Sequence, residues 1–135
     1  MNNNKGLMAG KRGLIMGVAN NRSIAWGIAK ACADQGAELA FTFQGDALKK
    51  RVEPLAAEVN SPIVVPCDVT DAASIDEAFK VIEKTWGKLD FLVHAIAFSD
   101  KNELEGRYVD TTSANFDKSL NISCYSFTAV AQCAE

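Results

Sequence analysis

The sequence contains little that would support a membrane anchor, a metal site or a disulfide framework. Its 135 residues contain no apolar run of the kind a membrane-spanning helix needs, which takes roughly 18 residues. No apolar segment with a small-residue cleavage site, typical of a secretory signal, follows the N-terminus. One histidine and four cysteines without a C-x-x-C pair leave little for a zinc site. We therefore predict a cytoplasmic protein that binds no metal and whose thiols are reduced and buried.

An excess of charge of one sign is also missing. The chain carries 14 Lys and Arg against 17 Asp and Glu, a formal net charge of −3 with the histidine neutral. Hydrophobic residues make up 48% and charged residues 23% of the chain, which is the mixture of a globular domain. This balance excludes a disordered tail and a nucleic-acid binder driven by bulk positive charge. The length allows one domain at most.

Short apolar runs alternate with segments of helical spacing along the chain. The runs predict strands over 12–18, 39–43, 63–65 and 89–94; the spacing predicts helices over 23–35, 46–59, 71–86 and 112–135; residues 99–110 read as a loop. Glycines at 36 and 87 stand where helices end. Pro54 lies inside a predicted helix, so we expect a kink or a restart there. The spacing in the first helix places Ile24, Ile28, Ala31 and Cys32 on one face.

The strands are continuous apolar runs, which is typical of a parallel sheet that helices cover on both faces. Right-handed β-α-β units then predict an α/β fold, a doubly wound parallel sheet of the Rossmann type with strand order 3-2-1-4. Four strands are only part of such a sheet. We therefore expect residues 1–135 to be the front half of a longer protein.

Ligands of this architecture bind at the carboxyl ends of the strands, so the loop over 17–27 is the first candidate. Gly17 allows a sharp turn, and Ser23 is a suitable N-cap residue. The helix that follows offers N–H groups and a positive dipole end to a pyrophosphate. Gly27 would remove a side chain where helix and strand meet. A plain turn before a capped helix explains the same residues.

The next two loops carry candidates for the adenosine end of a dinucleotide. Gln44 stands where NAD-specific sites usually have an acidic residue, and no arginine follows at once to receive a 2′-phosphate, which favours NADH over NADPH. Asp68 could accept a hydrogen bond from adenine, and Val69 could pack on the ring. Alternatively Asp68, Thr70 or Asp71 caps the following helix.

The fourth strand ends at His94, which could act as a general base. A single histidine at the end of a buried strand is more often a packed, hydrogen-bonded core residue. Small residues follow it at 95–97 and leave room for a ribose against the backbone.

Taken together, these loops resemble the short-chain dehydrogenase/reductase superfamily and, within it, the bacterial enoyl-acyl-carrier-protein reductases. The sequence lacks the T-G-x-x-x-G-x-G and N-A-G patterns of ordinary superfamily members and departs from them as these reductases do. The stretches that carry the resemblance are GVANNRSIAWGIA (17–29), GAELAFTFQ (36–44), CDV (67–69), FLVHAIAF (91–98) and ISCYSF (122–127).

The resemblance implies a role for individual residues. Gly17, Ser23 and Ile24 would hold the pyrophosphate of NAD, Gln44 would lie beside the adenosine, Asp68 and Val69 would clasp the adenine, Ile96 would pack near the nicotinamide, and Ser99 would touch the acyl substrate. The implied reaction is hydride transfer from NADH to a trans-2-enoyl thioester on acyl carrier protein, in fatty acid biosynthesis. The family also forms homotetramers through helices that include the one starting near Thr112. Lys49, Lys50 and Arg51 are a candidate patch for acidic acyl carrier protein, or simply an exposed charged helix face.

The catalytic pair that the resemblance implies is absent from these residues. The family uses a Tyr that stabilises the enolate and a Lys that holds the ribose, and neither Tyr108 nor Tyr125 is followed by Lys at either family spacing. We expect that pair beyond residue 135, with residues 1–135 as the NAD-binding N-terminal part of a single-domain enzyme. Another short-chain reductase of the ketoacyl type is an alternative, which the first loop and Ile96-Ala97 disfavour. A non-catalytic nucleotide-binding half-domain is a second alternative if the chain ends at 135.

Overall fold

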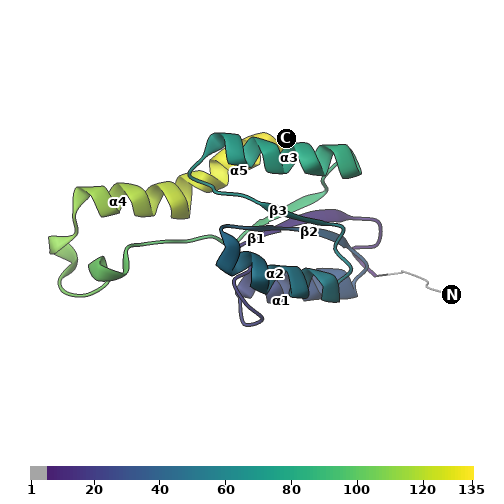
Figure 1. Cartoon of the computed structure of the whole chain (residues 1–135), viewed down its shortest axis with the longest axis horizontal. Helices are drawn as coiled ribbons and strands as arrows, with labels where there is room; N and C mark the ends of the chain where they lie inside the picture. The colour runs from purple at the N-terminus through teal and green to yellow at the C-terminus, as the bar shows by residue number, and fades with distance from the viewer. Residues whose placement is uncertain (1–5) are drawn as a thin grey trace.

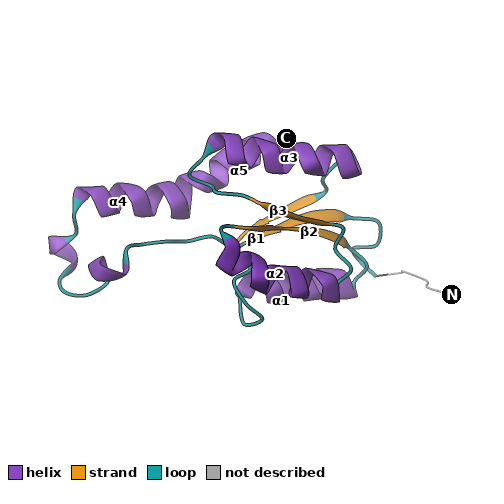
Figure 2. Cartoon of the chain, viewed as in Figure 1, coloured by secondary structure: helices purple, strands orange, loops and turns teal. Residues whose placement is uncertain are grey.

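Four parallel strands form one sheet in the order β3-β2-β1-β4, as a computed structural model of residues 6–135 shows (Figures 1 and 2). The pairing is parallel throughout, so the carboxyl ends of all strands lie along one edge. The predicted fold class and strand order are confirmed. The strands are β1 (Arg12–Met16), β2 (Glu38–Phe43), β3 (Ile63–Pro66) and β4 (Phe91–His94).

Helices cover the sheet on both faces (Figure 2). Two of them, α1 (Ile24–Asp34) and α2 (Asp46–Glu58), lie on one face, and α3 (Ala72–Trp86) and α5 (Ser126–Ala134) lie on the other. Between β4 and α5 the chain leaves the sheet and forms a protruding arm (Figure 1). The arm contains η1 (Lys101–Glu103), η2 (Tyr108–Asp110), α4 (Ser113–Leu120) and the π-helical turn η3 (Asn121–Tyr125).

The inner strand β1 is buried on both faces of the sheet, which explains its continuous apolar run. Leu14, Ile15 and Met16 are fully buried. Successive side chains of a strand point to opposite faces. Leu14 and Met16 therefore pack with residues of α3 and α5, whereas Ile15 packs with residues of α1 and α2.

Two expectations about the helices need correction. No restart occurs at Pro54, because the helix α2 runs through it, and Pro54 lies on the exposed face, where water can satisfy the carbonyl that proline leaves unpaired. The buried face of α1 is formed by Ala25, Trp26 and Ala29, and Ile24 is 81% exposed. The apolar spacing had pointed to Ile24, but that residue lies in the first turn of the helix, at the end that borders the strand termini.

The predicted helix over 112–135 is confirmed as a continuous helical segment from Ser113 to Ala134, but this segment contains a π-helical turn. Thr112 does cap its start, since its hydroxyl accepts a hydrogen bond from the Asn115 amide at 3.2 Å. The turn η3 then separates α4 from α5. A π-helical turn changes the helical register over a single turn, and apolar periodicity alone does not identify so local a change.

The cysteine prediction is half correct. All four thiols are free, as predicted. Cys67 is buried and Cys32 partly so, but Cys124 in η3 and Cys133 in α5 are exposed. No cluster of possible metal ligands occurs among residues 6–135, and no helix in that part of the chain has the length and apolarity to cross a membrane.

Arg12 of β1 contacts β2, α3 and the residue before β4 at the amino edge of the sheet. Its Nη1 donates to the Trp86 carbonyl oxygen at 3.0 Å, and its Nε donates to Glu38 at 3.2 Å. The guanidinium carbon lies 5.7 Å from the centre of the Trp86 ring, within cation–π range. Its own backbone amide donates to Asp90 at 2.9 Å. One side chain thus fastens the end of α3 to the starts of β1 and β2.

Replacing Arg12 with methionine is expected to lower the free energy of unfolding by about 1–2 kcal/mol, because a partly buried hydrogen bond and the ring contact are lost together. Urea titration followed by tryptophan fluorescence measures the change. Lys49→Met is the matched control, since Lys49 pairs with Glu53 at 3.9 Å on an exposed face; its loss should stay below about 0.5 kcal/mol. Equal losses in both variants would contradict the role of Arg12.

Candidate functional site

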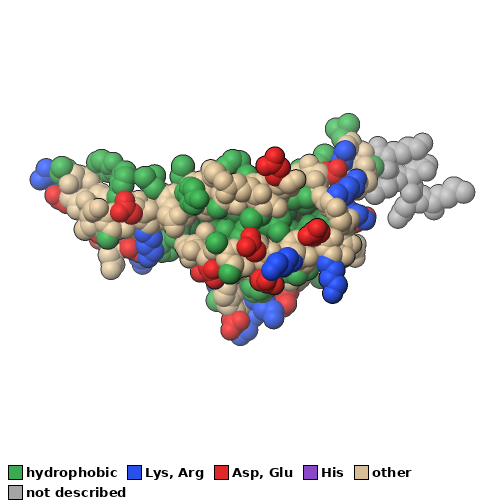
Figure 3. Space-filling view, turned by 90° about the horizontal axis from the view of Figure 1, so that it is seen from above, with side chains coloured by type: hydrophobic (Ala, Val, Ile, Leu, Met, Phe, Trp, Pro, Cys, Tyr) green, Lys and Arg blue, Asp and Glu red, His purple; other side chains and the backbone are tan. Residues whose placement is uncertain are grey.

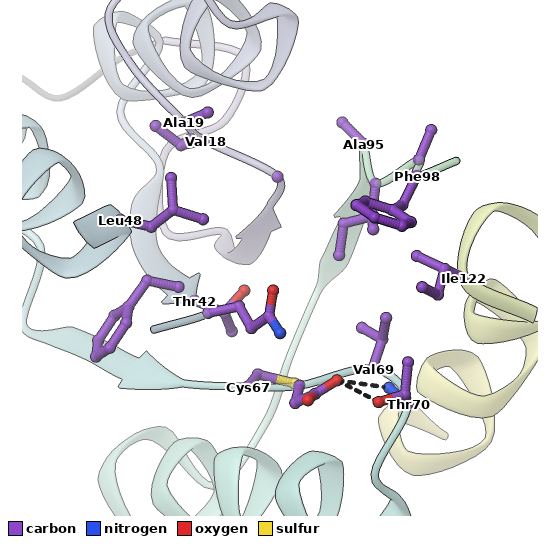
Figure 4. Close-up of a pocket in the computed structure, with 16 residues that line it drawn as sticks. Val18, Ala19, Thr42, Leu48, Cys67, Val69, Thr70, Ala95, Phe98 and Ile122 are labelled. Atoms are coloured by element: carbon purple, nitrogen blue, oxygen red, sulfur yellow. Dashed lines mark hydrogen bonds between the residues drawn. The ribbon is translucent and has the colours of Figure 1, made fainter. Parts of the chain in front are cut away.

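The loops at the carboxyl ends of the four strands enclose a cavity of about 240 Å³ (Figure 4). Its walls come from each strand end, from α2 and from η3. Chain topology therefore builds the cavity at the place where the strand order reverses, the usual ligand position in such a sheet. The lining residues are Gly17, Val18, Ala19, Thr42, Phe43, Gln44, Leu48, Cys67, Asp68, Val69, Thr70, Ala95, Ile96, Ala97, Phe98 and Ile122.

Gly17 directly follows β1 and lies against Ala95, the residue directly after β4. Its φ of +104° belongs to the region that favours glycine. A Cβ atom built at this position would lie 2.0 Å from the carbonyl oxygen of Ala95. The neighbour is backbone and cannot turn away, so the cavity floor requires a residue without a side chain.

The loop after β1 is closed by Ser23, though not as the sequence suggested. Ser23 occupies the N-cap position of α1, but its hydroxyl makes no hydrogen bond to the helix. It instead accepts hydrogen bonds from the amides of Ala19 at 2.9 Å and Asn20 at 3.1 Å. The hydroxyl therefore fixes the loop and leaves the first turn of the helix uncapped.

Two backbone N–H groups at the start of α1 are consequently available to a ligand. Within the described residues, the amides of Ile24 and Ala25 have no hydrogen-bond acceptor, whereas those of Trp26 and Gly27 both donate to the Ser23 carbonyl oxygen. Unpaired N–H groups at the positive end of a helix are typical of an anion-binding site. Ser23 and Ile24 do not line the cavity itself. The residues of this loop that line it are Gly17, Val18 and Ala19.

The expected packing role of Gly27 is wrong. Gly27 is exposed, and a Cβ atom built on it would meet no atom within 4 Å. The contact between α1 and the sheet is made by Ala25, Trp26 and Ala29, so Gly27 faces away from the strands.

Asp68 and Asp71 divide the two roles that the sequence left open. Asp71 caps α3, with its carboxylate accepting from the Ala73 amide at 3.0 Å. Asp68 lines the cavity, and its Oδ1 accepts from the Thr70 hydroxyl at 2.7 Å and the Thr70 amide at 2.9 Å (Figure 4). These bonds from Thr70, together with a weaker one from the Gln44 side chain, hold the pKa of Asp68 below its ordinary value. Asp68 therefore presents a negative charge to the cavity at neutral pH.

His94 is a packed residue, as the sequence favoured, and not a residue of the cavity wall. Its Nε2 lies 2.7 Å from the Ser126 hydroxyl, and its ring meets Phe127 edge-on at 5.7 Å between centroids. Burial lowers the pKa of His94 below its ordinary value, so the ring is neutral at pH 7. The residues that follow it, Ala95 to Phe98, line the cavity.

Ser99 lies just outside the cavity and is turned toward α4. Its hydroxyl oxygen accepts from the Asn115 side-chain amide at 3.1 Å and from the Ser119 hydroxyl at 3.1 Å. Asn115, which is buried, also accepts from the Asp100 amide at 3.0 Å. These bonds hold the start of the arm beside the cavity, and substrate contact by Ser99 stays a prediction.

Cavity residues that the sequence did not reveal fall into two groups. Thr42, Cys67 and Phe98 stand at or just after strand ends, so the predicted topology could have indicated them. The predicted topology could not have indicated Ile122, because this residue belongs to η3 and lies 24 residues after Phe98 in the sequence. Its position depends on how the arm folds back.

The thiol of Cys67 is expected to resist alkylation in the folded protein. Cys67 is 6% exposed, and burial together with the nearby charge of Asp68 raises its pKa to about 11. Roughly one thousandth of it is then thiolate at pH 8, and the thiolate is the reactive form. Iodoacetamide labelling followed by peptide mass spectrometry should modify exposed Cys124 first and Cys67 only after unfolding. Labelling of Cys67 as fast as Cys124 would contradict this description of the cavity.

Comparison with known proteins places these features in a family. Residues 17–135 match the family described as Enoyl-(Acyl carrier protein) reductase. The chain is 67% identical over 127 residues to enoyl-[acyl-carrier-protein] reductase [NADH] 2 of Rhizobium meliloti (strain 1021), covering 94% of this chain and 47% of that relative.

Solved structures agree with this result. A crystal structure of the enoyl-(acyl-carrier-protein) reductase of Anaplasma phagocytophilum in complex with NAD has a TM-score of 0.92 at 60% identity, covering 96% of this chain and 49% of that one. The Bacillus cereus enoyl-acyl carrier protein reductase, solved with NADP+ and indole naphthyridinone, has a TM-score of 0.92 at 41% identity, covering 96% and 51%. The chain thus spans about half the length of the relatives it matches.

Proposed function

The chain belongs to the enoyl-(acyl carrier protein) reductase family, and from that premise we propose that the protein containing it reduces trans-2-enoyl-acyl carrier protein to acyl-acyl carrier protein with NADH, in fatty acid biosynthesis. The observation that carries the proposal is that one loop connects Gly17, which lines the cavity at the strand ends and leaves no room for a side chain, to the unpaired amides of Ile24 and Ala25 at the start of α1. This combination fits a dinucleotide diphosphate.

NAD would be held by residues from all four strand ends. The amides of Ile24 and Ala25 would bind the diphosphate, with Gly17 allowing close approach and Ser23 keeping the loop in shape. Gln44 would contact the adenosine. When bound, the cofactor supplies the hydride; the protein supplies orientation and a site closed to competing reactions.

The adenine end would be recognised by Asp68 and Val69. The carboxylate of Asp68 is charged and already oriented by Thr70, so it is preorganised to accept a hydrogen bond from the adenine amino group. Gln44 is neutral, and the charge nearest to it in the cavity is the negative one on Asp68. Both features support a preference for NADH over NADPH, which carries an additional phosphate.

The nicotinamide end would lie along the segment after β4. Ile96 lines the cavity there, and Ser99, held by Asn115 and Ser119, borders the side that the acyl chain would use. We propose that residues 1–135 form the dinucleotide-binding part of a single-domain enzyme and that its Tyr and Lys pair lies elsewhere in the polypeptide. The absent Tyr–Lys spacing and the length of the relatives support this arrangement.

The protruding arm supports self-association, and we propose a homotetramer. Hydrophobic side chains gather along the arm (Figure 3). Phe116, Leu120, Tyr125 and Phe127 are each about half exposed on α4, η3 and α5. Burying such a surface against a second subunit would be favourable. The four free thiols support a reducing compartment, for which we propose the cytoplasm.

Cofactor oxidation with a crotonyl thioester tests the proposed reaction, with NADH and NADPH compared at equal concentration in the protein that contains these residues. We expect NADH to be oxidised and NADPH to react more slowly. Acetoacetyl thioester is the control substrate, since turnover of it alone would indicate a ketoacyl reductase. No turnover of the crotonyl thioester with either cofactor would overturn the proposal.

A further inference from the structure

A threonine hydroxyl in the wall of the cavity has no hydrogen-bond partner in the protein. Thr42 belongs to β2 and lines the cavity, although only 4% of the residue is exposed. Within residues 6–135 its hydroxyl forms no hydrogen bond. In that same part of the chain, every fully enclosed side-chain oxygen or nitrogen has a partner. The hydroxyl of Thr42 therefore opens onto the cavity that the residue lines.

The alternation of β2 shows to which side of the sheet this side chain points. Ala40 packs with residues of α3 and α5, whereas Phe43 packs with residues of α1 and α2. Thr42 lies two residues after Ala40 and therefore shares its face. The neighbouring strand end lies alongside, because the Cys67 amide donates to the Phe43 carbonyl oxygen at 2.8 Å. Figure 4 shows Thr42 between Leu48 and Cys67.

Thr42 thus lies on the adenosine side of the proposed site. Gln44 follows it by two residues, and Asp68 follows the end of β3, the strand that pairs with β2. All three residues line the same cavity. The segment after β4, which would border the nicotinamide, is separated from β2 by β1 in the sheet.

A hydroxyl at this position is useful only if something outside the protein bonds to it. Valine has nearly the same shape, suits a strand equally well and carries no polar group. Water can bond to the hydroxyl while the cavity is open. A ligand that displaces this water must replace its hydrogen bond or lose affinity, because a buried polar group without a partner is unfavourable. The effect of the hydroxyl on ligand affinity therefore reports direct contact.

Resting on the proposed function, we infer that the Thr42 hydroxyl is a further contact of the cofactor and bonds to its adenine from the wall of the cavity. A hydroxyl both donates and accepts, so it can serve a ring nitrogen or the amino group of the base. Asp68 can only accept at neutral pH, and Thr42 adds the donor that the ring nitrogens need. The bond is made only in the complex, since no acceptor within residues 6–135 uses this proton.

Thr42→Val in the whole protein tests this inference, because it removes the hydroxyl and keeps the shape of the side chain. The Kd of NADH is expected to rise about five- to tenfold, as loss of one hydrogen bond should. The Kd of ADP-ribose, which carries the adenosine without the nicotinamide, should rise by the same factor. The Tm of the ligand-free protein should stay unchanged or rise, since no hydrogen bond within residues 6–135 is lost. Titration calorimetry and thermal unfolding measure these quantities.

Two further variants serve as controls. Thr42→Ser keeps the hydroxyl and should leave both Kd values within about twofold, while loss of a buried methyl group lowers the Tm by about 2–4 °C. Affinity and stability are thus expected to separate in opposite ways in the two Thr42 variants. Thr85→Val removes an exposed hydroxyl from α3 and should change neither Kd.

Unchanged or tighter NADH binding by Thr42→Val would overturn the inference, because the ligand would then not use the hydroxyl. A loss that spares ADP-ribose would overturn it too, since the contact would not be with the adenosine. A lower Tm of ligand-free Thr42→Val would show instead that the hydroxyl stabilises the fold. If the unaltered protein binds neither ligand, the proposed function itself fails; if it binds both and only Thr42→Val departs from expectation, the adenine contact alone fails.

Discussion

Replacing Gly17 with alanine is expected to abolish measurable NADH binding. The new Cβ atom would lie 2.0 Å from the Ala95 carbonyl oxygen, at a φ of +104° that alanine rarely adopts. The strands β1 and β4 must then separate at the cavity floor. We expect the free energy of unfolding to fall by about 2–4 kcal/mol, as for other cases of backbone strain and steric overlap, and the Kd of NADH to rise more than about a hundredfold.

Gly27→Ala is the contrasting substitution for stability. Like Gly17→Ala, it adds one methyl group to a glycine. Gly27, however, is helical, exposed and surrounded by open space. Alanine there should raise the free energy of unfolding by about 0.5–1 kcal/mol, because it favours the helix. Urea titration of both variants and NADH titration of Gly17→Ala measure these effects. Unchanged stability and NADH affinity in Gly17→Ala would refute the role of the cavity floor.

Replacing Asp68 with alanine is expected to weaken NADH binding roughly ten- to hundredfold, the usual effect of losing a hydrogen bond to a charged acceptor in a binding site. Asp71→Ala is expected to change the stability of the fold and not the affinity for NADH. Since Asp71 caps α3 through the Ala73 amide, its loss should lower the free energy of unfolding by about 1 kcal/mol and leave NADH affinity unchanged.

Thermal unfolding and NADH titration of both aspartate variants separate the two roles. Thr70→Val is a useful additional control, since it removes the hydroxyl that orients Asp68 and keeps the carboxylate; an intermediate loss of affinity is expected. Weaker NADH binding in Asp71→Ala than in Asp68→Ala would contradict the assignment.

The arrangement of the sheet could be predicted because burial leaves a simple record in the sequence. β1 is covered on both faces, so Leu14, Ile15 and Met16 are all apolar. Once the strand order is known, the strand ends must lie together, and Gly17, Gln44, Asp68, Val69 and Ile96 do line one cavity. Their roles toward NAD remain predictions.

Other features depend on hydrogen-bond geometry that composition and periodicity do not contain. Ser23 occupies the predicted cap position, yet its hydroxyl turns back to the loop and leaves the helix amides unpaired. Pro54 is tolerated because it lies on an exposed face of α2. The turn η3 adds a change of helical register that apolar spacing does not detect, and Ile122 reaches the cavity only through it.

A crystal structure of the protein with bound NAD tests the central claim most directly, because that claim concerns where the diphosphate lies. The account predicts the diphosphate against the amides of Ile24 and Ala25 beside Gly17, with the adenine next to Asp68 and Val69. A dinucleotide bound in the opposite direction, or a diphosphate that contacts neither amide, would contradict it.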